Sequence, residues 1–181
     1  HLYFEEDEYG LHPLTDHPHY RRFFTGDFYR EAFEEEAPFG SDEGSDTYSE
    51  LATAMRGKKP ISLEDFPRYV VEDLWEMWFR SPIPGRVAEH FERDFEDAKK
   101  ANSALGDILL LQCDQVIVAT ALGAVRITGR VPLELVDLAL AALERMELWY
   151  QRQDYDPMST ASQIRADLHA YRSWLLSTRA E

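Results

Sequence analysis

The sequence predicts a mainly α-helical protein: an irregular bundle of about five to six helices with an aromatic, loop-rich N-terminal layer. Two observations lead to this prediction. Apolar residues recur at helical spacing over most of residues 47–181, with short connections that favour antiparallel neighbours. Residues 1–46 instead lack a sustained period and alternate acidic runs with aromatic and proline-containing stretches. At a length of 181 residues, we expect residues 1–181 to form a single domain.

In the N-terminal layer, Pro18 is suited to open one or two helical turns across residues 17–24. After the turn signal of Gly26 and Asp27, a weakly supported strand is predicted around residues 28–29. The composition of residues 37–46 is that of a loop, with turn-forming glycine, serine and aspartate.

The first long helix is expected to begin at Asp46 or Thr47, because Thr47 and Glu50 have the spacing of a capping box. Gly57 is placed to end this helix as a C′ glycine. Five more helices are expected from the apolar spacing, at about 67–80, 86–101, 107–127, 132–149 and 159–177.

The range 107–127 is apolar nearly all round, which is typical of a central buried helix. The β-branched residues at 116–118 also permit a strand, but the length of the range favours a helix. We expect no membrane-spanning segment, because Thr120 and Gly123 interrupt the longest apolar run. Gly129 and Pro132 mark a helix end followed by a helix start.

Charge is unevenly distributed along the chain, whose formal net charge is −15. Residues 1–56 hold fourteen acidic and four basic residues, a net charge of −10. A field of this sign repels phosphate backbones and anionic lipids, so we expect no direct contact with nucleic acid or membrane. It favours a basic protein partner, although net charge also serves solubility alone.

The single cysteine and the start of the chain both indicate a cytoplasmic protein. Cys113 cannot form an internal disulfide, and its apolar surroundings favour a buried residue over a nucleophile. The acidic start lacks the basic region of a signal peptide. Hydrolase elbows and glycine-rich nucleotide loops are also missing from the sequence, so no catalytic residue is predicted.

Two groups of residues suggest a divalent metal ion. Imidazole and carboxylate side chains gather at His12, Asp16, His17 and His19. Pro18 directs the last two histidines apart, and capping or surface roles around the prolines are the favoured interpretation. Residues 42–46 cluster three carboxylates around a glycine, as in hard-cation sites. Their spacing is not that of a calcium loop, and turn formation and helix capping account for the same residues.

Partner contacts are predicted in two places. The first is acidic and consists of Glu34, Glu35, Glu36, Asp42 and Glu43. The second is an aromatic patch at residues 75–79, which one helical face cannot bury entirely. Trp75 and Trp78 are therefore candidates for a partner surface, or alternatively for packing against the N-terminal aromatic residues.

Residues 37–47 read Ala-Pro-Phe-Gly-Ser-Asp-Glu-Gly-Ser-Asp-Thr, preceded by His17-Pro18 and by Asp27-Phe28-Tyr29. This pattern resembles the YfeS-like uncharacterised bacterial proteins, and its Pro-Phe and aspartate positions are similar to the opening of DUF4259 proteins. The resemblance implies a bacterial cytoplasmic protein with a helical remainder, and carries over no catalytic residue. A tryptophan expected soon after Tyr29 is replaced by Arg30 and Glu31.

Three functions fit these observations. The first is a non-catalytic acidic protein-binding module without a cofactor, such as an immunity or inhibitor protein for a basic partner, or a nucleic-acid mimic. The second is a metal-binding protein or metal-dependent enzyme that uses the N-terminal histidines and aspartates. The third is an adaptor that docks through the helix at 67–80.

Overall fold

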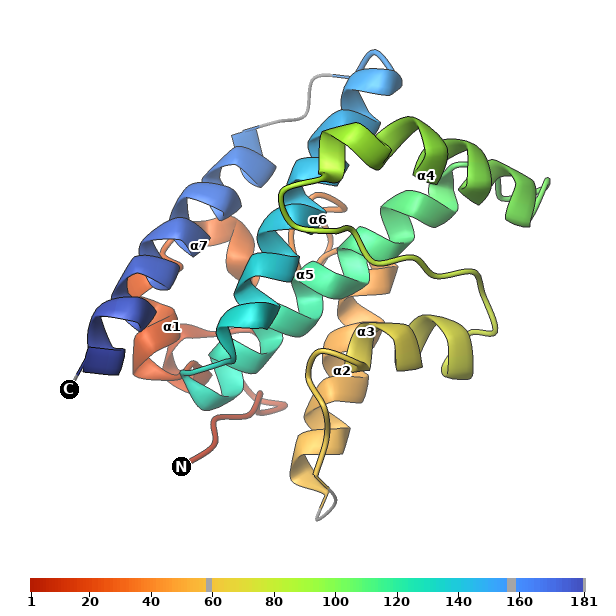
Figure 1. The fold of residues 1–181 in the computed structure, drawn as a ribbon. Coiled ribbons are helices and arrows are strands. Elements are labelled where there is room, and N and C mark those ends of the chain that lie inside the picture. Colours follow the sequence, from red (N-terminus) through yellow and green to blue (C-terminus); the bar gives the residue numbers. More distant parts are fainter. Residues whose placement is uncertain (58–59, 156–158, 181) are drawn as a thin grey trace.

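The computed structural model describes residues 1–57, 60–155 and 159–180. Within these ranges it contains α-helices, short 3-10 and π segments, and no strand longer than the single bridge between Glu6 and Gly10. The predicted mainly helical, irregular bundle is thus confirmed (Figure 1). One continuous hydrophobic core joins residues from Tyr20 in the N-terminal layer to Leu175 in the last helix.

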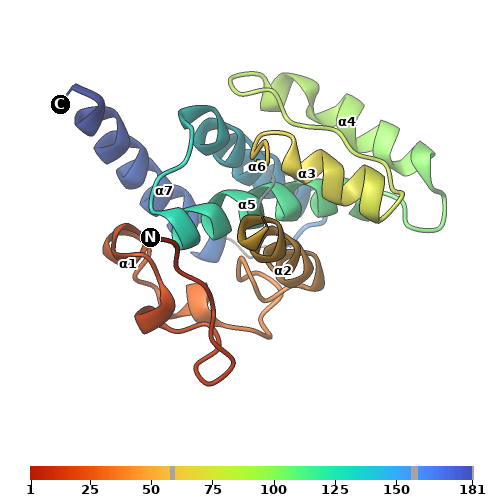
Figure 2. The same ribbon diagram turned by 90° about the horizontal axis from the view of Figure 1, so that it is seen from below.

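Helix α5 (Ile108–Thr128) forms the centre of this core, as the sequence predicts. Five helices pack against it, and Figure 2 shows them arranged around it: α1 (Pro18–Phe23), α2 (Asp42–Arg56), α3 (Phe66–Arg68), α4 (Val87–Ala101) and α6 (Leu133–Arg152). By length and composition, α5 is long and apolar enough to cross a membrane. This differs from the expectation that the chain contains no such segment. Because 89% of its most apolar stretch of 18 residues is buried in the fold, α5 has the character of a core helix.

Three further helices agree with the predicted ranges: α4 (Val87–Ala101), α6 (Leu133–Arg152) and α7 (Ser159–Ser177). The predicted inward residues of α4 and α7, such as Phe91, Phe95 and Leu168, are buried. Gly129 ends α5 in the left-handed conformation, with φ of 79°. Pro132 caps α6, where its missing N–H leaves no helical bond unmade.

The N-terminal layer contains the predicted helical turns as α1 (Pro18–Phe23), which lies beside α5 and α7. The strand prediction is wrong, because Asp27–Arg30 form a 3-10 helix. This turn buries the Tyr29 ring and lets its hydroxyl donate to Asp167 Oδ2 at 2.6 Å. A long-range bond of this kind cannot be seen in local periodicity.

Helix α2 (Asp42–Arg56) begins four residues before the earlier of the two predicted caps. Its cap is Ser41, whose Oγ accepts the Gly44 N–H at 3.0 Å, and the predicted capping box is not formed. Thr47 instead donates its hydroxyl to the Glu43 carbonyl at 2.6 Å. Gly57 does end the helix, with an ordinary negative φ of −71°.

The predicted helix at 67–80 is the largest error. It consists of a short α3 (Phe66–Arg68) that continues as a π turn, Tyr69–Leu74, and stops there. The backbone turns at Glu76, whose φ is 54°, and residues 75–80 cross α5 as an extended segment. This path buries Phe79 and brings the Arg80 carbonyl to the Arg145 guanidinium at 2.7 Å, contacts that outweigh local helix propensity.

Two buried ionic networks hold other elements against α5. In the Arg126 network, near the C-terminal end of α5, the guanidinium of Arg126 pairs with Asp16 and donates to Tyr48 and to Thr15, the last at 2.8 Å. Arg30 forms a second ion pair with Asp16, at 2.7 Å. These contacts fix α2 and the N-terminal layer to α5.

The Arg145 network lies nearer the N-terminal end of α5. Arg145 of α6 pairs with Asp114 at 2.7 Å and with Asp94 of α4 at 3.2 Å. Arg80 pairs with Asp94 at 3.2 Å and with Asp97 at 2.7 Å. Burial raises the pKa of Asp114 to about 6, although Arg145 acts in the opposite direction.

Candidate functional site

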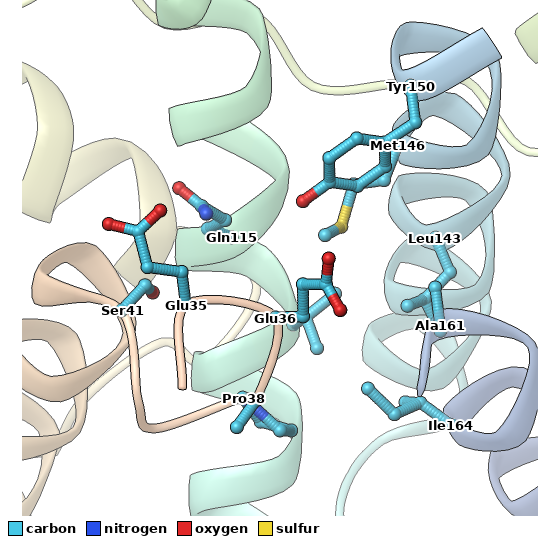
Figure 3. A pocket seen from close by; sticks show the side chains of 12 residues that line it. Glu35, Glu36, Pro38, Ser41, Gln115, Leu143, Met146, Tyr150, Ala161 and Ile164 are labelled. Carbon is cyan, nitrogen blue, oxygen red and sulfur yellow. The ribbon is translucent and has the colours of Figure 1, made fainter. Parts of the chain in front are cut away.

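An acidic groove opens where the loop at residues 34–41 faces α5, α6 and the start of α7 (Figure 3). Its outer part has a volume of about 800 Å³ and leads to a narrow inner notch of about 20 Å³, room for about one water molecule. The two parts meet at a neck formed by the four residues that line both, Glu35, Glu36, Gln115 and Tyr150.

The walls of the two parts differ. The inner notch is mainly apolar, with Pro38, Val118, Leu143, Met146, Ala161 and Ile164 around it. The outer part adds one more carboxylate and both polar and apolar side chains, namely Glu34, Ile108, Leu111, Trp149, Gln153 and Tyr155. No lysine or arginine is among the described residues that line either part.

The motif at residues 37–47 builds the loop that carries the acids. Phe39 is buried against the Tyr48 ring, with centroids 4.9 Å apart, which anchors the loop to α2. A Cβ at Gly40 would lie 2.0 Å from the Glu34 carbonyl oxygen, and one at Gly44 would lie 2.1 Å from the Pro38 carbonyl oxygen. Both glycines are therefore required for the loop to fold back on itself and onto α2.

The groove glutamates (Glu34, Glu35 and Glu36) form no ion pair with any residue in the described ranges. The Tyr155 hydroxyl donates to Glu36 Oε1 at 3.1 Å, and this bond raises the pKa of Tyr155. Burial, followed by the charges of Glu36 and Glu35, raises the pKa of Tyr150 to about 12. The neck is thus a site of uncompensated negative potential, suited to a cation.

The other predicted partner residues lie outside the groove. Asp42 and Glu43 belong to the first turn of α2, where their charges complement the helix dipole. The loop predicted at residues 37–46 is therefore wrong over 42–46, which are helical. Gly44 allows close packing against Pro38 and does not have a positive φ.

Trp75 and Trp78 are half-buried on the segment that crosses α5. The carbonyl of Trp78 faces the Cys113 thiol at 3.7 Å, and the Met77 sulfur accepts from Gln112 at 3.1 Å. The aromatic patch thus packs on α5, not on the N-terminal aromatic residues. Cys113 itself is fully buried, which raises the pKa of its thiol to about 12, as expected of a packing residue.

The predicted metal ligands have structural roles. His12 Nδ1 accepts the Leu14 N–H, His17 Nδ1 accepts the His19 N–H, and both bonds are 3.1 Å long. Asp16 is completely buried in the Arg126 network. Nowhere in the described parts of the chain do three or more His, Cys, Asp or Glu side chains form a group that could hold a metal ion.

Sequence reasoning missed the groove's other polar residues, Gln115 and Tyr150. Gln115 is the one residue of α5 between positions 109 and 127 that is half-buried instead of buried, and it lies at the groove. Tyr150 lies one position beyond the helix predicted at 132–149. Gln115 is one of several polar residues of the central helix, so no local signal distinguishes it from Gln112 or Asp114, and its place at the groove depends on a loop distant in sequence.

The fold and the groove define a small helical protein with an acidic groove. The chain is similar to the Uncharacterized protein YfeS of Escherichia coli (strain K12), with 30% identity over 146 residues. The alignment covers 81% of this chain and 56% of that protein, so the chain spans about half the length of its relative. This similarity confirms the YfeS-like resemblance. No family model and no solved structure matches the chain.

Proposed function

We propose that this chain is a non-catalytic, acidic binding module that holds a basic protein partner in the acidic groove. One observation carries the proposal: the groove glutamates lie beside apolar walls and have no ion-pair partner among the described residues. A basic side chain that entered the groove would find both charge and apolar contact there, whereas elsewhere the fold neutralises its buried acids internally.

The distribution of charge supports the same proposal. The net charge of −10 on residues 1–56 surrounds the groove loop with further acids, including Asp42 and Glu43. Such a field steers a cationic partner and accelerates its association. An immunity or inhibitor protein, acting in the cytoplasm of a bacterium on a basic target, is the concrete form that we favour.

Metal-dependent activity has less support. The side chains of His12, His17 and Asp16 already bond to neighbouring backbone or arginine groups, and they do not converge on a common point. The binding module therefore remains the favoured function.

The test compares three forms of the protein in affinity capture from a bacterial lysate, at low and high salt, with mass spectrometry. The groove variant carries Glu34→Gln, Glu35→Gln and Glu36→Gln. The control variant carries Glu6→Gln, Asp7→Asn and Glu8→Gln, which removes the same charge from exposed positions outside the groove.

We expect a basic protein that the wild type and the control variant capture at low salt and release at high salt. The groove variant should fail to capture it. If the groove variant captures the same proteins as the wild type at both salt concentrations, the proposed function is wrong.

A further inference from the structure

The hydroxyl of Tyr150 points into the neck of the groove (Figure 3). Tyr150 as a whole is 9% exposed, and its hydroxyl has no hydrogen bond to any described residue. Tyr29 and Tyr171, by contrast, donate to Asp167 at 2.6 Å and to the Gly129 carbonyl at 3.1 Å. Because the hydroxyl of this largely buried tyrosine reaches the open groove, it is free to bond to a group that enters the neck.

The charges around this hydroxyl determine what it can bind. Figure 3 shows the Glu36 carboxylate directed into the same space, with Glu35 and Gln115 on the other side of the neck. Tyr155 occupies one oxygen of Glu36, and the other has no described partner. The Tyr150 hydroxyl is neutral at physiological pH, as in any ordinary tyrosine, and its oxygen can accept a hydrogen bond.

The narrowness of the site just inside the neck distinguishes between cations. The notch beyond it has room for about one water molecule, which suits a compact group and not a planar guanidinium. An ammonium has three N–H donors that point to different acceptors, whereas arginine prefers a single carboxylate in a planar fork. The apolar side chains of Ile108 and Leu111 line the outer groove, where a lysine's methylene stem can lie.

We propose, building on the function above, that the neck binds the ammonium group of a lysine side chain from the basic partner. The lysine stem lies along Ile108 and Leu111, and the ammonium donates to Glu36, to the Tyr150 oxygen and to the Gln115 side-chain carbonyl. Glu34 and Glu35 supply the surrounding negative potential.

The test uses two fluorescently labelled Gly-Ser peptides of equal length and charge, one with lysines and one with arginines. Fluorescence anisotropy at low salt gives their affinities for the wild type, Tyr150→Phe, the groove variant and the control variant. Tyr150→Phe removes only a hydroxyl without a described partner, so we expect it to fold, which circular dichroism checks.

We expect the wild type to bind the lysine peptide about tenfold more tightly than the arginine peptide, the equivalent of one hydrogen bond to a charged group. Tyr150→Phe should remove most of this preference and leave the affinity for the arginine peptide unchanged. The control variant should keep the preference.

The two proposals fail in different ways. Equal affinities for the two peptides in the wild type, with no effect of Tyr150→Phe, would overturn the lysine site. The proposed function would still stand in that case if the groove variant bound both peptides more weakly than the control variant. If the groove and control variants bound both peptides equally, the groove would not be the cation-binding surface, and both proposals would fail.

Discussion

Buried carboxylates and groove carboxylates differ in what neutralises them. Asp16, Asp94 and Asp114 lie inside the fold, and each is paired with at least one arginine. The groove glutamates lie at the surface, and no described lysine or arginine contacts them. The charges that hold the helices together and the charges offered to a partner are therefore separate sets, and a variant in one set should leave the other property intact.

The largest effect is expected for Arg145→Met, which leaves Asp114 and Asp94 buried without their shared partner. Losing one member of a buried ionic network typically costs about 3–5 kcal/mol of unfolding free energy. Urea unfolding followed by circular dichroism measures this loss. Arg172→Met is the control, because its pair with Asp137 is one-third exposed on both sides and should cost less than about 1 kcal/mol. Equal losses would show that the buried network contributes no special stability.

A smaller effect should follow from disturbing the contact between the N-terminal layer and the end of α5. Gly129→Ala places a Cβ 2.1 Å from the His17 ring, at a backbone φ of 79°. Left-handed strain alone costs about 1–2 kcal/mol, and displacing the ring adds to it. Gly106→Ala is the matched control, since its φ of 63° is also positive but no atom lies within 4 Å of the new Cβ.

Thermal unfolding of the two alanine variants isolates the His17 contact. We expect Gly129→Ala to unfold at a clearly lower temperature than Gly106→Ala. Identical midpoints would mean that the N-terminal layer moves away from α5 without cost.

The raised pKa of Asp114 gives the Arg145 network a pH dependence. A carboxyl group whose pKa is about 6 in the folded protein and 3.8 when unfolded binds its proton more tightly in the folded state. Its contribution to stability is therefore present below pH 3.8 and lost as the pH rises through about 6. Between pH 7 and pH 5, the unfolding free energy of the wild type should gain relative to that of Asp114→Asn. An unchanged difference between the two proteins would contradict this prediction.

The smallest effect on stability is expected for the groove variant. The groove glutamates form no ion pair with described residues, so their neutralisation should change the unfolding free energy by less than about 0.5 kcal/mol. Urea unfolding of the groove and control variants tests this. A loss of more than about 1 kcal/mol in the groove variant alone would mean that these acids also stabilise the fold.

The sequence predicted those parts of the fold that depend on local periodicity. The spacing of apolar residues located α4, α5, α6 and α7 within a few residues, and the end of α5 at Gly129 followed from glycine chemistry. It failed at residues 67–80, where the burial of Phe79 and the bond from Arg145 to the Arg80 carbonyl override helix propensity.

For the candidate site, the sequence identified the acids and missed their setting. Clustered glutamates at 34–36 were evident from charge alone. Tyr150 and Gln115 meet them only because the loop folds over α5 and α6, through contacts between segments some 80 to 115 positions apart in the chain. No local pattern encodes such contacts.

The most direct test of the proposed function is the salt dependence of affinity for the lysine peptide, measured on the wild type, the groove variant and the control variant. If the groove is the binding surface, the groove variant should lose at least about tenfold in affinity at low salt and most of its salt dependence, while the control variant stays close to the wild type. Equal losses in the two variants would show that binding follows total charge and not the groove.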